Sequence, residues 1–227
     1  MCLNGNKQWA GNAQSEFPAF FFCSMIICMK FIYKDTCGVA ESEILKNSEK
    51  LSLYTESLKK IIAEGKYLEP ESSIVLPTDS EIMDAVSEIK NKLYSPKLKY
   101  IFLVGIGGQN LGVKAIYEAV YNEPYGLGSS VPKIIFVDTV NPNFLSKLQN
   151  FITNEVSDPE ELAIIISSKS GSTLEISVNA ELLSGFVEGA FPKTLASRTA
   201  VITNKNSPLW SLAKEKKYSI LEMPEIV

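Results

Sequence analysis

From Tyr100 onward the chain alternates between short apolar runs and longer segments with helical spacing. The apolar runs read as strands and lie at Tyr100–Val104, Lys133–Val137, Leu162–Ser167, Thr199–Thr203 and Tyr218–Leu221. Helical patterns fall between them, near Val113–Tyr121, Asn143–Phe151, Leu174–Leu183 and Pro208–Lys216. Regular alternation of strand and helix predicts βαβ units with right-handed crossovers. We therefore expect an α/β fold with a three-layer, doubly wound parallel sheet of five strands.

A helical lead-in is predicted before this sheet. Apolar residues follow one face over Ser42–Ala63 and again over Asp79–Leu93, with a loop between the two segments. Residues 29–98 are therefore expected to be a helical lead-in, and residues 99–227 the α/β domain.

The first residues have a different pattern. The unbroken apolar run "FPAFFFCSMIICM" (Phe17–Met29) is shorter than the roughly 20 residues that span a bilayer. Because "KFIYKDT" after Met29 resembles a native beginning, we interpret residues 1–28 as an adventitious extension outside the core. A weak membrane anchor is the alternative.

Composition narrows the possible functions. A hydrophobic content of 45% with 21% charged residues is typical of a soluble globular protein, and the net charge of −4 argues against nucleic-acid or membrane-surface binding. Histidine is absent and Arg198 is the sole arginine. The usual acid–base side chain and the commonest metal ligand are therefore missing.

Cysteine usage points to a reducing compartment. All four cysteines lie near the start of the chain, at Cys2, Cys23, Cys28 and Cys37. Such a distribution suits neither a disulfide framework nor a zinc site. We expect a cytoplasmic protein without a metal or another cofactor.

A glycine-rich loop follows the first predicted strand, in "YIFLVGIGGQNLG". Gly105, Gly107 and Gly108 free the backbone and allow a ligand to approach it closely, as in loops that bind anions at the start of a helix. The dinucleotide-binding fingerprint fails because Asn110 stands where its last glycine is required. The nucleotide P-loop fails because Val113 separates Gly112 from Lys114.

A second loop, "SSKSGST" (Ser167–Thr173), follows the third strand. It offers the hydroxyls of Ser168, Ser170, Ser172 and Thr173, the cation of Lys169, and Gly171 for a turn. A helix N-terminus adds free N–H groups and its dipole, which together predict a phosphate site. The alternative is a serine-rich helix cap without a ligand. In a sheet of order 2-1-3-4-5, both loops border the crevice where ligands bind.

The paired motifs "VGIGGQNLG" and "SSKSGSTLE" resemble the sugar isomerase domain of the phosphoglucose isomerase family, over about Lys99–Val227. In that family the first loop reads GIGGS and the second SK-S/T-x-T-T, and both bind a sugar phosphate. The resemblance implies that this chain binds substrate through Gly107, Gly108, Gln109, Ser168, Lys169, Ser170, Gly171, Ser172 and Thr173. Gln109 departs from the family serine, and Ser172 replaces a common threonine.

The resemblance also implies an activity, the interconversion of glucose 6-phosphate and fructose 6-phosphate by an aldose-ketose isomerase that usually dimerises. The chain's last segment resembles the stretch that runs into GGR-F/Y-S in the family. The family's catalytic arginine, glutamate, histidine and lysine would lie beyond Val227, so we expect no catalytic residue within the chain and no turnover by it alone. Glu175 is better explained as a first-turn carboxylate than as a base.

Two other interpretations remain open. The chain could be a stand-alone phosphosugar-binding module without chemistry, or an α/β domain whose loops only cap helices. In every case we expect no nucleic acid, membrane or metal as a partner, and for the first two a hexose 6-phosphate as ligand.

Overall fold

The computed structural model describes residues 36–121 and 132–226. The predicted apolar extension lies outside these residues. By its internal contacts the chain divides into two units, Met1–Leu53 and Tyr54–Val227. The second unit holds the sheet and both of the predicted phosphate loops.

The predicted helix over Ser42–Ala63 is wrong as a single helix. The structure has two helices there, α2 (Glu41–Lys50) and α3 (Ser52–Glu64), with Leu51 between them. No residue of α2 is buried, and Ile61 is the buried residue of α3. Helical periodicity was therefore a correct guide to the secondary structure of this segment, but not to the break at Leu51.

Two further elements complete the lead-in. A 3₁₀ helix, η1 (Ser72–Thr78), lies in the segment that sequence analysis leaves as a loop. Helix α4 (Ser80–Leu93) follows, and the Asp79 carboxylate caps it by accepting hydrogen bonds from Glu81 N at 3.0 Å and Ile82 N at 3.1 Å. Asp79 also accepts a hydrogen bond from Tyr67 Oη at 2.8 Å.

The predicted sheet is confirmed. Its strand order is β2-β1-β3-β4-β5 and every neighbouring pair is parallel. The strands are β1 (Tyr100–Val104), β2 (Lys133–Val137), β3 (Leu162–Ser168), β4 (Thr199–Asn204) and β5 (Ser219–Met223). Between β1 and β3 the register places Val104 opposite Ile166, so the two phosphate loops leave the sheet at the same edge.

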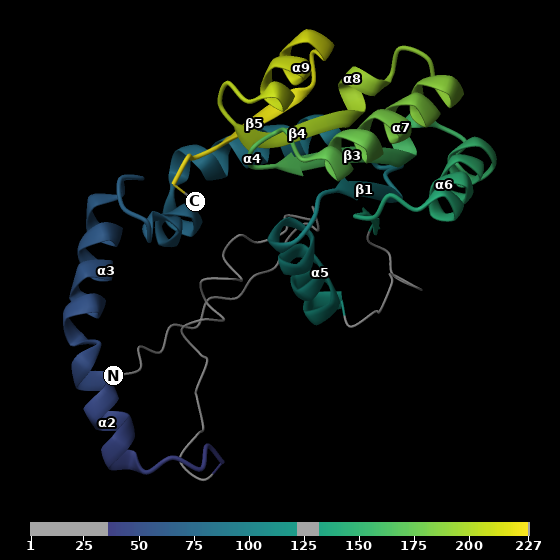
Figure 1. The fold of residues 1–227 in the computed structure, drawn as a ribbon. Helices are drawn as coiled ribbons and strands as arrows, with labels where there is room; N and C mark the ends of the chain where they lie inside the picture. Colours follow the sequence, from purple (N-terminus) through teal and green to yellow (C-terminus); the bar gives the residue numbers. More distant parts are fainter. Residues whose placement is uncertain (1–35, 122–131, 227) are drawn as a thin grey trace, which may run out of the picture. The chain divides into compact units, whose positions relative to one another are not determined.

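Helices cover both faces of the sheet, as Figure 1 shows for α7, α9 and α4. The crossover elements are α5 (Gly108–Tyr121), α6 (Pro142–Glu155), η3 (Pro159–Glu161), α7 (Leu174–Ala190), α8 (Leu195–Arg198) and α9 (Pro208–Lys216). Helices α7 and α9 pack on the strands and α6 packs beside α7, and these helices bury a core with Phe102, Ile164, Ile166 and Val201. On the opposite face Leu93 of α4 packs against Ala163 and Ala200.

Helix α5 begins earlier than its apolar pattern predicts. It starts at Gly108 rather than near Val113, so Gly112 lies inside the helix and not in the loop. Tyr117 is buried, whereas Val113, Ile116 and Val120 are 39%, 50% and 57% exposed. The apolar stripe of this helix therefore turns partly to solvent.

Candidate phosphate-binding site

The first loop is a tight connection from β1 into α5. Gly107 has φ +61°, a conformation that favours glycine, and its carbonyl accepts the first hydrogen bonds of α5 from Asn110 N at 3.1 Å and Leu111 N at 2.9 Å. Apart from their chain neighbours and the backbone of their own helix, no atom of the described residues lies within 4 Å of the position that a Cβ would take at Gly107 or Gly108. The loop therefore leaves open space above its backbone.

Gln109 connects this loop to the second one. With its amide oriented so that both polar atoms find partners, Nε2 donates to Ser167 O at 2.8 Å and Oε1 accepts from Lys169 N at 3.1 Å. The neighbouring Asn110 is 3% exposed, and neither its nitrogen nor its oxygen has a partner among the described residues. Sequence analysis gave no signal for the burial of Asn110, because a turn-forming residue beside glycines predicts exposure.

The second loop begins with two buried serines, Ser167 and Ser168, and has three exposed polar side chains after them. Ser168 is 1% exposed, and its Oγ accepts a hydrogen bond from Gly171 N at 3.1 Å. Lys169, Ser170 and Ser172 are exposed, and Ser170 Oγ accepts from Ser172 N at 3.3 Å and from Ser172 Oγ at 3.2 Å. Ser168 therefore shapes the loop, while the exposed side chains face outward.

Two structural features require glycine at position 171. Its φ is +64°, which agrees with the predicted turn. A Cβ at this position would lie 2.5 Å from Ser207 Oγ and 2.9 Å from Leu209 Cβ. The loop thus rests against the start of α9, and only glycine fits there.

The N-terminus of α7 opens at the end of this loop. Thr173 is the residue before the helix, and its side chain makes no capping hydrogen bond to α7. Its Oγ1 lies 3.5 Å from Ser168 Oγ. The first-turn N–H groups of a helix have no intrahelical acceptor, and the positive end of the helix dipole lies there. This helix of 17 residues can therefore stabilise an anion at Thr173.

The two loops line one cavity of about 780 Å³. Six predicted residues contribute to it, namely Gly108, Gln109, Ser168, Lys169, Ser170 and Thr173. Gly107, Gly171 and Ser172 are not among its lining residues. The convergence of the loops at the carboxyl ends of β1 and β3 is what the sheet order predicts.

Sequence analysis missed two parts of this cavity. Asn204 and Met223, from the ends of β4 and β5, also line it. Asn204 N donates to Lys169 O at 3.2 Å, and Asn204 Nδ2 donates to Met223 O at 2.8 Å. Asn204 thereby ties the second loop to the neighbouring strands. Its position one residue past the predicted end of a strand was the available signal, since ligands bind at that edge.

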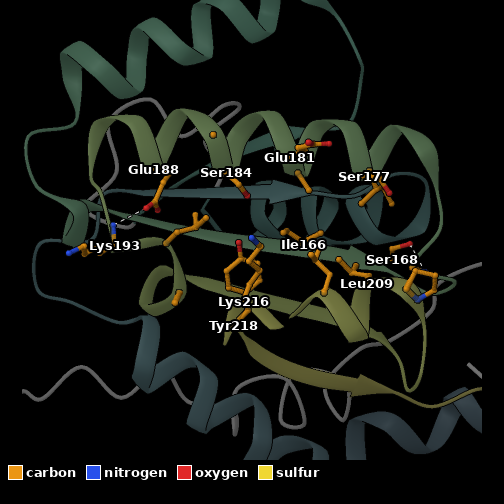
Figure 2. A pocket seen from close by; sticks show the side chains of 18 residues that line it. Ile166, Ser168, Ser177, Glu181, Ser184, Glu188, Lys193, Leu209, Lys216 and Tyr218 are labelled. Carbon is orange, nitrogen blue, oxygen red and sulfur yellow. Dashed lines mark hydrogen bonds between the residues drawn. The ribbon is translucent and has the colours of Figure 1, made fainter. Parts of the chain in front are cut away.

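A larger cavity, of about 840 Å³, lies between α7 and α9. Figure 2 shows Ser177, Glu181, Ser184 and Glu188 along α7, with Leu209, Lys216 and Tyr218 across from them. Its lining is mainly apolar, and Glu188 Oε1 accepts a hydrogen bond from Lys193 N at 3.0 Å. It meets the smaller cavity at Ser168 and Ile176 but includes neither Lys169 nor Gln109. The residues predicted to bind phosphate therefore lie mainly at the smaller cavity.

The carboxylates of the described residues lie outside the lining of the smaller cavity. No Asp or Glu is among its described lining residues. Glu175 is exposed in the first turn of α7, as expected for a first-turn carboxylate. Asp138 accepts a hydrogen bond from Thr139 Oγ1 at 3.1 Å, and Glu222 forms an ion pair with Lys205 at 3.7 Å.

The described residues contain neither a metal-binding cluster nor a membrane-spanning helix. Within residues 36–121 and 132–226, no group of three or more His, Cys, Asp and Glu side chains could hold a metal ion. In the same part of the chain, every helix is too short or too polar to cross a membrane.

Known proteins resemble this chain in sequence. Glucose-6-phosphate isomerase of Aster yellows witches'-broom phytoplasma is 30% identical over 152 residues, covering 66% of this chain and 33% of that protein. The enzyme of the same name from Chlamydia muridarum is 34% identical over 119 residues, covering 52% of this chain and 21% of that protein. No family model matches the sequence. The chain thus spans a third or less of these curated relatives.

Solved structures resemble its fold. A hypothetical protein from Thermus thermophilus superposes with a TM-score of 0.59 at 23% identity, covering 79% of this chain and 40% of that one. A glucose-6-phosphate isomerase from Chlamydia trachomatis superposes with a TM-score of 0.50 at 23% identity, covering 65% and 26%. The sequence similarity confirms the resemblance drawn from the two loop motifs.

Proposed function

We propose that this chain, a relative of glucose-6-phosphate isomerases over part of their length, binds the phosphate group of a hexose 6-phosphate between its two loops. One observation carries the proposal. The glycine loop after β1 and the hydroxyl-rich loop after β3 line a single cavity, at the N-terminus of a long helix. Such a combination of free N–H groups, hydroxyls and a cation is suited to phosphate.

Each group has a distinct role in this proposal. The first-turn N–H groups of α7 and the Thr173 hydroxyl donate to phosphate oxygens, and Lys169 supplies the positive charge. Ser170 adds a donor at the cavity, and Ser172, outside its lining, donates to Ser170 Oγ. Gly107 and Gly108 leave room for the ligand. Ser168 and Gly171 hold the loop in shape.

The proposed reaction of the complete enzyme is the aldose-ketose isomerisation of glucose 6-phosphate and fructose 6-phosphate. Binding of the remote phosphate positions the reacting carbons, so that binding energy is used to lower the barrier. Catalytic groups would come from outside this chain. The homodimer and the cytoplasmic location implied by the resemblance belong to the same proposal.

A non-catalytic phosphosugar-binding module is the second candidate. The observation that favours it is chemical: the whole sequence holds no histidine, and the cavity is lined by no Asp or Glu among the described residues. General acid–base groups contribute typically 10²–10⁴-fold each to a rate. A cavity without such groups would bind the sugar phosphate but not isomerise it.

Calorimetry with the full chain tests the proposed binding. We expect fructose 6-phosphate to bind and fructose not to bind. Lys169→Ala removes a charge-assisted contact, worth about 1.5–3 kcal/mol, and should weaken binding roughly ten- to a hundredfold.

The matched control is Lys147→Ala, which removes the same charge from an exposed position on α6. Lys147→Ala should leave the affinity within about twofold of the unsubstituted chain, because exposed charges at a distance are screened by salt. Equal affinities for the Lys169 and Lys147 variants, with both folded by circular dichroism, would remove Lys169 from the site.

A further inference from the structure

The Gln109 side chain bonds to the main chain of β3 on both sides of Ser168. Its Nε2 donates to Ser167 O at 2.8 Å, and its Oε1 accepts from Lys169 N at 3.1 Å. Ser167 and Ser168 are both buried, at 6% and 1% exposed. A buried main-chain carbonyl requires a hydrogen-bond donor, so the bond from Gln109 Nε2 satisfies the carbonyl of the buried Ser167.

The pattern is that of a parallel β-bridge. In a parallel pair, one residue donates its N–H to the carbonyl that precedes the opposite residue, and accepts from the N–H that follows it. The β1–β3 register ends with Val104 opposite Ile166, so its continuation would place Ile106 opposite Ser168. The backbone of β1 instead turns away at Gly105–Gly107, and the Gln109 amide makes the bonds that Ile106 would have made.

Gly105 lies beside this arrangement. A Cβ at Gly105 would lie 3.4 Å from Ser167 O and 3.5 Å from Gln109 Cβ, which are ordinary van der Waals distances. The two bonds of the Gln109 amide therefore do not depend on glycine at position 105. The first turn of α5 then carries Gln109 back to the edge that the strand has left.

We propose that Gln109 is a positioning residue: its side-chain amide extends the β1–β3 ladder by one step and fixes the Ser168–Lys169 segment in the phosphate-binding cavity. The consequence for phosphate binding rests on the proposed function, whereas the two hydrogen bonds of the Gln109 amide do not. Because the two loops belong to different βαβ units, Gln109 sets the spacing between them. Its polar atoms form hydrogen bonds to the second loop, and the second loop makes the proposed phosphate contacts.

Loss of the Gln109 bonds should weaken phosphate binding, because binding depends on the distance between the two loops. The proposed phosphate contacts depend on the placement of Lys169 and Thr173 relative to the glycine loop. A misplacement of about 1 Å can remove much of the contribution of such contacts. Asn204 N holds the other side of the same segment through Lys169 O, at 3.2 Å. Loss of the Gln109 bonds would free one side of the loop while the other stays attached to β4.

Amide hydrogen exchange of the full chain, followed by NMR, tests the bonds without any ligand. Gln109→Met keeps the length of the side chain but removes both polar atoms. We expect the Lys169 amide to exchange roughly tenfold faster, while the Asn204 amide keeps its protection. Gln109→Glu should restore part of the protection of the Lys169 amide, because a carboxylate still accepts from Lys169 N but cannot donate to Ser167 O. Unchanged exchange at Lys169 in Gln109→Met would overturn the proposed ladder extension.

Calorimetry with fructose 6-phosphate then tests the positioning role. Gln109→Met should bind about tenfold more weakly, and Gln149→Met, the same change on an exposed part of α6, should bind normally. Faster exchange at Lys169 with unchanged affinity would overturn the role in the site. If the unsubstituted chain does not bind fructose 6-phosphate, the proposed function fails, and the exchange at Lys169 still decides whether Gln109 holds the loop.

Discussion

At the scale of single residues, Gly107 and Gly171, the two glycines with positive φ in the predicted phosphate loops, are required for different reasons. Gly107 has φ +61° with open space around its Cβ position, whereas Gly171 has φ +64° and faces Ser207 and Leu209. Gly107 is therefore required for its conformation alone. Gly171 is required for its conformation and also for its size.

Alanine at these two positions should separate the two requirements. Gly107→Ala should lower the free energy of unfolding by about 1–2 kcal/mol, the cost of a left-handed conformation. Gly171→Ala adds the overlap of its Cβ with Ser207 Oγ, 2.5 Å away, and should lower it by roughly 2–5 kcal/mol. Urea denaturation of both variants measures the difference. A loss at Gly107 as large as that at Gly171 would contradict the assignment of the contact.

At the scale of elements, one buried guanidinium joins α4 to the sheet. Arg198 is 6% exposed, and its Nε donates to Leu162 O at 2.7 Å while its Nη2 donates to Leu93 O at 2.8 Å. Burial lowers the pKa of the Arg198 guanidinium, which remains charged because the pKa of arginine is so high. The only arginine of the chain therefore satisfies carbonyls at the end of α4 and at the start of β3.

Arg198→Lys should destabilise the fold although it keeps the charge. A lysine has no planar fork and cannot reach two carbonyls on separate elements in the same way. Because hydrogen bonds to a charged group contribute about 1.5–3 kcal/mol, we expect the free energy of unfolding to fall by roughly 2–3 kcal/mol. Thermal and urea unfolding provide the measurement. Stability equal to that of the original chain would show that α4 is held by its apolar contacts alone.

The Asp79 cap of α4 should make the stability of the fold depend on pH in the acidic range. The hydrogen bond from Ile82 N, followed by that from the Tyr67 hydroxyl, lowers the pKa of the Asp79 carboxyl. In turn, burial and the Asp79 carboxylate raise the pKa of Tyr67 to about 12. A carboxyl with a depressed pKa stabilises the fold fully above its unfolded pKa, near 3.9, and loses that contribution as the pH falls through the folded value.

Asp79→Ala should therefore be less stable than the original chain near neutral pH, by about 1 kcal/mol as for other helix caps. The difference between the two should shrink below about pH 4, as Asp79 becomes protonated. Denaturant midpoints at a series of pH values test this. A difference that stays constant down to the lowest pH would mean that the carboxylate charge has no part in the cap.

At the scale of the whole molecule, the cavity proposed to bind phosphate has no Asp or Glu among its described lining residues. We expect the purified full chain to bind fructose 6-phosphate weakly and to show no measurable turnover in a coupled assay. The reason is the lack of histidine in the sequence and of carboxylates among the described lining residues. Turnover that persists after removal of host isomerase would refute this expectation. It would direct the search for a base to Glu175, Asp138 and Glu222.

The local pattern of the chain predicted its elements well, because strand and helix periodicities depend on neighbours in sequence. The bounds predicted for β1, β2 and α9 are those of the structure, and the other strands differ by one or two residues. The meeting of the two loops also followed from the sequence, since strand alternation restricts the topology to few choices. The roles of the site residues themselves stay predictions.

Only the tertiary structure decided which groups meet across those elements. The partners of Gln109, Gly171 and Arg198 come from segments far away in sequence, and no local pattern encodes them. The exposed stripe of α5 has a similar cause: periodicity shows that a helix has an apolar face, but not whether another element packs on it. Local sequence thus determined the strands, helices and chemistry of the loops, while contacts between distant segments determined how those loops are held.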